Sequence, residues 1–282
     1  MAVPKIGQFN RRRVLKGVGT TLGVLALRGF SVQANEAAHF THGVASGDPL
    51  SDRVILWTRV IPGSGNHSEV EAIWQVALDA DFTQVVSSGV ATSSKTTDYT
   101  LKVDASGLTP NGSFFYRFIV AGKSSPIGRT KTLPLGRVDQ YKIGVASCSN
   151  YPQGYFNAYK HMAESDLDLV LHLGDYIYEY ADGRYANRVA LEQLGRNVQP
   201  PNEILSIEDY RMRYGLYRTD PDLMAVHHRH PFICVWDDHE LTNNTWKGGA
   251  ENHNEGEGDF DQRMRAARQA YHEWLPIRTT SH

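Results

Sequence analysis

Short apolar runs alternate with polar residues along the first part of the chain, and glycine and proline separate the runs. Runs at residues 54–60, 71–78, 99–103 and 114–120 predict β-strands, because successive side chains of a strand point to opposite faces. Their spacing predicts a small antiparallel β-sandwich, immunoglobulin-like or fibronectin-like, as a domain over residues 39–135. We expect its large aromatic residues to form the core rather than to contact a ligand: Trp57, Trp74 and Tyr116.

A different pattern begins near residue 139, where apolar strands alternate with helical spacing. Residues 142–147 predict a strand, residues 154–163 a helix, and residues 167–173 a second strand. This strand–helix–strand order predicts parallel neighbours, and the continuous apolar run of the second strand predicts burial on both faces. A third buried strand is expected at 231–236. We therefore predict an α/β region over residues 139–282.

The segment between the second and third strands gives weaker signals. Residues 182–205 are polar and contain glycine, which predicts a surface excursion. Apolar residues at helical spacing predict two helices, at 207–216 and 222–228.

Residues 1–34 have the layout of an export signal. Arg11 and Arg12 precede a hydrophobic pair and Lys16, a weakly apolar run follows, and small residues up to Ala34 suit cleavage. The arrangement resembles the twin-arginine signal, so we expect a periplasmic or secreted protein that uses the twin-arginine export machinery. The alternative is a basic amphipathic helix. No other window is apolar enough for a membrane span, so none is expected in the mature chain.

The charge of the chain is unevenly distributed. Six of the 29 Lys and Arg residues lie before residue 35 and none of the 31 acidic residues does, so the remainder has a formal charge of about −8. Stable sequence-independent binding of nucleic acid needs a basic surface, and we do not expect it.

Polar side chains follow each predicted strand of the α/β region. Cys148 follows the first strand, Asp175 and Tyr178 the second, and residues 237–244 the third. The carboxyl ends of parallel strands meet at one edge of a sheet, where such folds bind ligands. Oxygen donors suit hard cations, whereas a thiolate with a phenolate suits ferric iron. A carboxylate such as Asp175 could bridge two cations that activate one water and clamp a phosphoryl group.

Other readings of these residues remain open. His227, His228 and His230 lie close together, but successive side chains of a helix point about 100° apart, so we do not expect one ion to hold all three. Cys148 and Cys234 could form a disulfide in an exported protein, although Cys234 lies in an apolar strand and fits a buried thiol.

Four motifs, spread from the start of the predicted sandwich to the third strand, show a family resemblance. They are Phe40-Thr-His-Gly-Val-Ala-Ser-Gly-Asp-Pro49, Ala146-Ser-Cys-Ser149, Leu173-Gly-Asp-Tyr-Ile-Tyr-Glu179 and Trp236-Asp-Asp-His-Glu240 with Asn243-Asn244. Together they resemble the PhoD-like alkaline phosphatase and phosphodiesterase family. The resemblance implies an exported enzyme with an amino-terminal sandwich, a metallophosphoesterase-like catalytic domain, and ferric iron (Fe³⁺) and calcium (Ca²⁺) at the site.

The resemblance also implies roles for individual residues. Cys148 and Tyr178 would bind the iron, and Asp175 would bridge iron and calcium. His239 would be the catalytic residue that steadies the phosphoryl oxygens.

The same resemblance implies two calcium ligands after the third strand. They are Asp238 and Asn243, with Asp237 and Asn244 as the nearest competitors for these roles.

The family takes further ligands from motifs that follow the third strand at a distance, and the chain ends before any such motif. We therefore expect a C-terminally truncated member with an incomplete sheet. Its expected activity is hydrolysis of a small phosphate ester or phosphodiester by a metal-bound hydroxide, weak or absent in this chain alone. The alternative is a catalytically inactive binding or scaffold fragment. A zinc hydrolase would require spacing such as HExxH, which is absent.

Overall fold

The computed structural model describes residues 40–63 and 68–279. All of these described residues belong to one compact unit. The predicted export signal at residues 1–34 lies outside the described ranges and stays a prediction. Within those ranges, no helix has the length and apolar character that crossing a bilayer requires.

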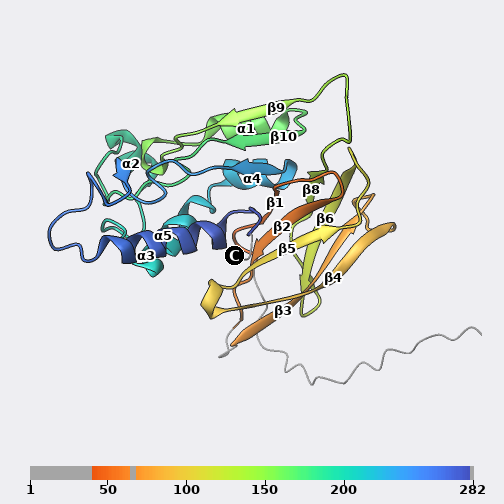
Figure 1. Cartoon of the computed structure of the whole chain (residues 1–282), viewed down its shortest axis with the longest axis horizontal. Helices are drawn as coiled ribbons and strands as arrows, with labels where there is room; N and C mark the ends of the chain where they lie inside the picture. The colour runs from red at the N-terminus through yellow and green to blue at the C-terminus, as the bar shows by residue number, and fades with distance from the viewer. Residues whose placement is uncertain (1–39, 64–67, 280–282) are drawn as a thin grey trace, which may run out of the picture. The chain divides into compact units, whose positions relative to one another are not determined.

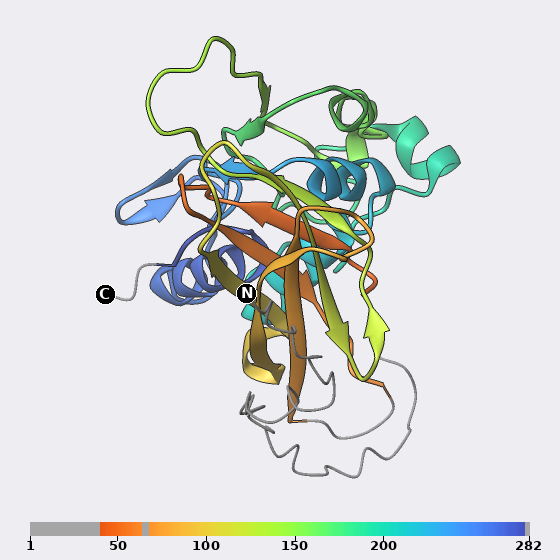
Figure 2. The ribbon, with the colours of Figure 1, turned by 90° about the vertical axis from the view of Figure 1, so that its right-hand side faces the viewer.

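The first part of the described chain forms two packed antiparallel layers (Figures 1 and 2). One layer has the order β4-β3-β6-β7 with β8 beside β6, and the other contains β5-β2-β1. The elements are β1 Val44–Gly47, β2 Arg53–Arg59, β3 Glu69–Ala77, β4 Val85–Ser94, the 3₁₀ helix η1 Lys95–Thr97, β5 Thr100–Ser106, β6 Ser113–Val120, β7 Lys123–Ser124 and β8 Gly128–Lys131. The predicted sandwich is confirmed. Strand β4 was not predicted, because serine, threonine and glycine fill most of its positions.

Within the described residues, the α/β part contains three short parallel strands and five α-helices, and Figure 1 shows their arrangement. Its elements are β9 Ile143–Ala146, the 3₁₀ helix η2 Tyr151–Gln153, α1 Asn157–Glu164, β10 Leu169–His172, α2 Arg188–Leu194, α3 Ile207–Tyr217, α4 Pro221–Arg229, β11 Phe232–Cys234, the hairpin β12 Thr245–Trp246 and β13 Gly249–Ala250, and α5 Phe260–Trp274. Strands β9, β10 and β11 are parallel neighbours, as predicted. The predicted surface excursion at residues 182–205 contains the short helix α2, whose first N–H groups are capped by the side chain of Asn187.

Strand β1 joins the two parts into one six-stranded sheet, which the sequence did not predict. It pairs antiparallel with β2 and parallel with β11, in the order β5-β2-β1-β11-β10-β9. One face of β1 and β2 packs into the sandwich core through Val44 and Leu56. The opposite face packs into the core beneath the helices through Ala45 and Trp57. The Trp57 indole N–H donates to the carbonyl of Glu273 at 2.8 Å, which ties β2 to α5.

The large aromatic residues of the sandwich are placed as expected, with one qualification. Trp57 and Tyr116 are fully buried. Trp74 is half-buried at the margin of the sandwich core. Tyr116 therefore lies in the sandwich core as expected and Trp74 packs against it in part, whereas Trp57 is a core residue of the region beneath the helices.

The prediction that the second strand is buried on both faces is met only in part. In β10, Val170 and His172 are buried on one face, whereas on the other face Leu169 is buried and Leu171 is half-buried. On the neighbouring strand β9, Ile143 and Val145 are exposed. In the described part of the chain, the helices cover only one face of these strands. The apolar sequence of a strand was therefore not sufficient to predict burial of both faces.

Acidification should destabilise this fold through its buried histidines. Burial lowers the pKa of His42 to about 3 and the pKa values of His172 and His228 to about 4. His228 Nε2 accepts a hydrogen bond from the N–H of Val44 at 3.2 Å, which requires an unprotonated nitrogen. The unfolded chain protonates its histidines near pH 6.5, so stability is complete above that pH and is lost as pH falls towards 4.

Each of these three histidines should cost about 1 kcal/mol of unfolding free energy between pH 7 and pH 5.5. Urea unfolding at the two pH values measures the loss. The variant His172→Gln isolates one histidine, because it should reduce the difference between the two pH values by about 1 kcal/mol. Equal pH dependence of the variant and the parent chain would contradict the assignment.

Candidate metal centre

The three parallel strands bring their following loops together at one edge of the sheet. Cys148 follows β9, Asp175 follows β10, and Asp238 follows β11. The loops are joined by backbone hydrogen bonds of 3.1 Å, from Cys148 N–H to the Gly174 carbonyl and from Ser149 N–H to the Asp175 carbonyl. Cys148 and Asp175 have φ angles of 55° and 54°, a left-handed conformation that is costly for these residues and concentrates at functional sites.

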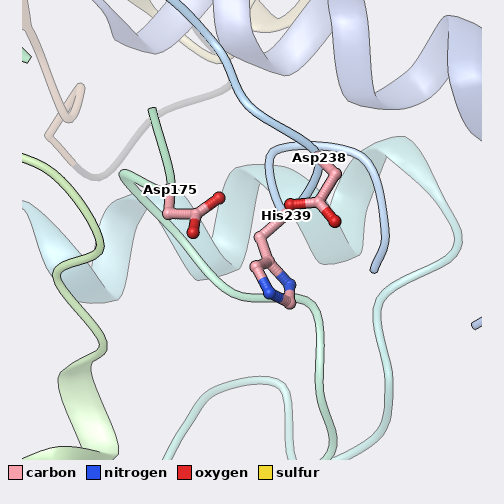
Figure 3. Close-up of side chains that lie close together, drawn as sticks. All are labelled: Asp175, Asp238 and His239. Atoms are coloured by element: carbon pink, nitrogen blue, oxygen red, sulfur yellow. The ribbon is translucent and has the colours of Figure 1, made fainter. Parts of the chain in front are cut away.

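Asp175, Asp238 and His239 form a cluster that fits a cation. One potential ligand atom from each lies within 4.8 Å of the other two. Figure 3 shows the carboxylates of Asp175 and Asp238 facing each other across a gap, with the His239 imidazole beside it. The Asp175 Oδ1 atom is buried and has no hydrogen-bond partner among the described residues. A buried, unpartnered carboxylate oxygen is costly, and a bound cation would satisfy it.

Cys148 and Tyr178 both approach the Asp175 carboxylate, and their role as iron ligands stays a prediction. The Tyr178 hydroxyl donates to Asp175 Oδ2 at 3.1 Å. Burial raises the pKa of Asp175, and His239 and hydrogen bonds from Cys148 and Tyr178 partly offset the effect. Burial and the Asp175 charge raise the pKa of Tyr178, so its phenol is neutral unless a cation removes the proton.

His239 is oriented by a buried carboxylate. Its Nδ1 lies 2.7 Å from Glu179 Oε2, which leaves Nε2 as the nitrogen that can face a ligand or substrate. The other Glu179 oxygen accepts from Asn243 N–H at 2.8 Å and from Asn252 Nδ2 at 2.7 Å. Burial favours a low pKa for His239, but the hydrogen bond and charge of Glu179 outweigh it and raise the pKa. The imidazole therefore favours a form with a proton to donate.

Glu240 connects the second and third loops. Its buried carboxylate accepts from the backbone N–H groups of Asp175, Tyr176 and Asp237 at 3.1, 2.6 and 2.9 Å. Burial raises the pKa of Glu240 to about 7, against the lowering effect of these donors. One side chain thus fixes the backbone on both sides of the gap between Asp175 and Asp238.

The remaining predicted calcium residues lie around Asp238. The carboxylate of Asp238 accepts from the N–H of Asn244 at 2.5 Å, and it is Asp238 rather than Asp237 that belongs to the cluster. The side-chain amides of Asn243 and Asn244 both donate to Glu251, Asn243 at 3.4 Å. The structure places Asn243 beside the cluster with its amide nitrogen directed to Glu251, and its role as a calcium ligand stays a prediction.

The structure answers the open alternatives. Cys148 and Cys234 are free thiols, so they form no disulfide. The three neighbouring histidines have different partners, as their helical spacing predicted. His227 Nε2 pairs with the Tyr176 hydroxyl at 2.8 Å, His228 with β1, and His230 Nε2 with the Met162 carbonyl at 3.0 Å.

Two important residues were missed from the sequence: Glu179 and Glu240. Each ends a motif that was recognised for its other residues, four positions after Asp175 and two after Asp238. An acidic residue that follows a strand end can either bind a cation or accept hydrogen bonds from backbone N–H groups. Sequence spacing alone does not distinguish these two roles.

Comparison with known proteins identifies the family. The family model "PhoD-like phosphatase" matches residues 143–282, and the model "PhoD-like phosphatase, N-terminal domain" matches residues 26–134. Alkaline phosphatase D of Bacillus subtilis (strain 168) is 40% identical over 292 residues, which cover 97% of this chain and 49% of the relative. A solved structure of PhoD is 42% identical with a TM-score of 0.79, over 85% of this chain and 46% of that one. The chain spans about half the length of these relatives and belongs to the PhoD-like phosphatase family.

Proposed function

We propose that this chain carries the first part of a phosphoric ester hydrolase centre, of the alkaline phosphatase and phosphodiesterase kind. The observation that supports the proposal most directly is the cluster of Asp175, Asp238 and His239 at the ends of parallel strands, with an unpartnered buried oxygen. Membership of the PhoD-like family supports the same reaction class. Bound cations would supply the positive charge that activates water and neutralises a phosphoryl group.

The residues would have different roles that follow from their chemistry. Asp175 and Asp238 would hold the cations, and Asp175 would be a ligand shared by both cations. Cys148 and Tyr178 offer the thiolate and phenolate that suit ferric iron, whereas Asp238, with Asn243, offers the oxygen ligands that suit calcium. His239, held by Glu179 through Nδ1, would donate from Nε2 to a phosphoryl oxygen as negative charge develops there.

Metal loading with a visible signal tests the proposal. The purified chain, supplied with Fe³⁺ and Ca²⁺, should bind iron and show the visible absorption of a phenolate bound to ferric iron. Tyr178→Phe should abolish that absorption. The matched control is Tyr185→Phe, because the Tyr185 ring packs 5.6 Å from that of Tyr178. A chain that stays colourless and free of metal would contradict the proposal and favour a binding protein without catalysis.

Hydrolysis is tested separately, with nitrophenyl phosphate and bis-nitrophenyl phosphate as substrates. We expect weak activity at most from the 282-residue chain, because it spans about half of its relatives. Any metal-dependent activity should disappear in His239→Asn. Activity that persists in that variant would contradict the role of His239.

We further propose that the protein is exported by the twin-arginine route. The basic start of the chain, with Arg11 and Arg12 before a weakly apolar run, supports this. Replacing both arginines by lysine should retain the protein in the cytoplasm, as cell fractionation would show. Unchanged export would contradict the route.

A further inference from the structure

Arg213, on helix α3, carries a buried positive charge that no carboxylate neutralises by direct contact. Its side chain is fully buried. The buried Arg196 and Arg263 each pair with a carboxylate, whereas Arg213 forms no ion pair among the described residues. A buried charge without a counter-ion is costly unless other polar groups satisfy it.

Backbone carbonyl groups satisfy this guanidinium. Its five hydrogen bonds go from Nη1 to the carbonyls of Tyr178 and, at 3.0 Å, Tyr180; from Nε to Gln199 at 3.0 Å; and from Nη2 to Pro200 at 3.1 Å and Asn202 at 3.4 Å. The donors of a guanidinium have a fixed planar arrangement. Arg213 therefore holds two chain segments, residues 178–180 and residues 199–202, in one relative position.

The first of these segments is held at every carbonyl. Arg213 binds the carbonyls of Tyr178 and Tyr180, and the Glu179 carbonyl between them accepts from the N–H of Ile204 at 3.1 Å. Three successive carbonyls are therefore paired. This pairing fixes the directions in which the side chains of Tyr178 and Glu179 leave the backbone.

These two side chains serve different parts of the candidate metal centre. The Tyr178 hydroxyl donates to the Asp175 carboxylate at 3.1 Å. The Glu179 carboxylate lies 2.7 Å from Nδ1 of His239. A shift of this backbone would therefore displace the proposed iron ligand and the support of the imidazole together.

We propose that Arg213 is a positioning residue, which orients Tyr178 and, through Glu179, also His239. Packing alone would be served at lower cost by an apolar side chain of similar length, because a buried charge gives no general gain in stability. The five carbonyls on two segments are what an apolar side chain could not hold. For Tyr178 the inference rests on the proposed function, whereas the orientation of His239 can be measured without metal.

The variant Arg213→Met tests the proposal, because it keeps an unbranched side chain and removes all five donors. In the metal-free parent chain, proton NMR should show the Nδ1–H of His239 as a low-field signal, because its hydrogen bond to Glu179 slows exchange with water. Loss of the signal in His239→Asn identifies it. We expect Arg213→Met to lose this signal as well.

A second measurement uses the loaded chain. With Fe³⁺ and Ca²⁺ supplied, Arg213→Met should bind iron at least about 10-fold more weakly than the parent chain, as is typical when the support of a metal ligand is removed. The phenolate-to-iron absorption per bound iron should also fall, because Tyr178 would no longer be held towards Asp175.

The matched control is Arg218→Met. Arg218 is also fully buried and caps the same helix, but it donates to the His42 carbonyl at 3.3 Å and to the Tyr176 hydroxyl at 3.5 Å, and it packs over Trp57. This variant should lose stability yet keep the His239 signal and the iron affinity. Thermal unfolding measures the stability of both variants.

The variant Arg213→Lys keeps the test decisive if Arg213→Met does not fold. Lysine retains the positive charge, but its three donors cannot reach all five carbonyls. We expect the same two changes as in Arg213→Met, to a smaller extent.

The outcomes separate this proposal from the proposed function. A His239 signal that is lost in the Arg213 variants and kept in Arg218→Met supports the positioning role, even when the parent chain stays colourless with iron. Equal losses in the Arg213 and Arg218 variants overturn it, because general loss of packing would explain both. An unchanged signal in the Arg213 variants, or a parent chain without the signal, also overturns it.

Discussion

Replacing Asp175 by asparagine should empty both proposed cation positions at once. The carboxylate of Asp175 has one buried oxygen without a partner among the described residues, and it lies between Tyr178, the proposed iron ligand, and Asp238, the proposed calcium ligand. Removing even a residue that only hydrogen-bonds to a metal ligand typically lowers metal affinity by about 10- to 100-fold. Removing a bridging ligand should therefore lower the affinity for both metals by more than about 100-fold. Equilibrium dialysis with Fe³⁺ and Ca²⁺, followed by elemental analysis, measures the effect.

The control for this variant is Asp237→Asn. Asp237 occupies the adjacent position to Asp238 but lies outside the cluster, and its side chain is exposed. This variant should keep both metals. Loss of only one metal in Asp175→Asn would contradict the bridging role, and metal loss in Asp237→Asn would reassign the ligand after β11.

Glu240→Ala should lower the free energy of unfolding by about 3–5 kcal/mol. The substitution leaves the buried N–H groups of Asp175, Tyr176 and Asp237 without their acceptor, and each unsatisfied donor is costly. Because these donors flank the metal cluster, metal affinity should fall as well. Urea unfolding measures the first effect and equilibrium dialysis the second.

Two controls bracket this result. Glu240→Gln keeps the shape and one acceptor oxygen, so it should cost about 1–3 kcal/mol. Among the described residues, the Glu251 carboxylate accepts only from the side chains of Asn243 and Asn244 near the surface, so Glu251→Ala should cost less than about 1 kcal/mol. An equal loss in Glu240→Ala and Glu251→Ala would show that Glu240 does not hold the two loops.

The position of the candidate centre was predictable because local patterns determine it. The βαβ order required β9 and β10 to be parallel, and parallel strands place Cys148 and Asp175 at the same edge. The structure added the distances, and it selected Asp238 over Asp237 for the cluster. That choice depends on the turn after β11, where Glu240 holds the Asp237 N–H and points the following carboxylate into the gap.

The long-range features could not be predicted from local patterns. The pairing of β1 with β11 joins Gly47 to Phe232, and no periodicity in either segment identifies the other. The functions of Glu179 and Glu240 depend on backbone N–H groups that are 64 and 65 residues away in the chain, respectively. The partly exposed face of β10 could not be predicted either. An apolar run indicates that a strand can be buried, but it does not show that another layer covers it.

The shared sheet determines the order in which this protein can complete its folding. Strand β1 is an inner strand of the sandwich, yet its second neighbour, β11, is synthesised almost 190 residues later. The sandwich therefore cannot complete the pairing of β1 until the ribosome has synthesised the α/β part. Long-range pairing of this kind also slows folding. The two halves of the sheet therefore complete their folding together. A destabilising substitution near Phe232 should destabilise the amino-terminal strands as directly as a substitution within those strands.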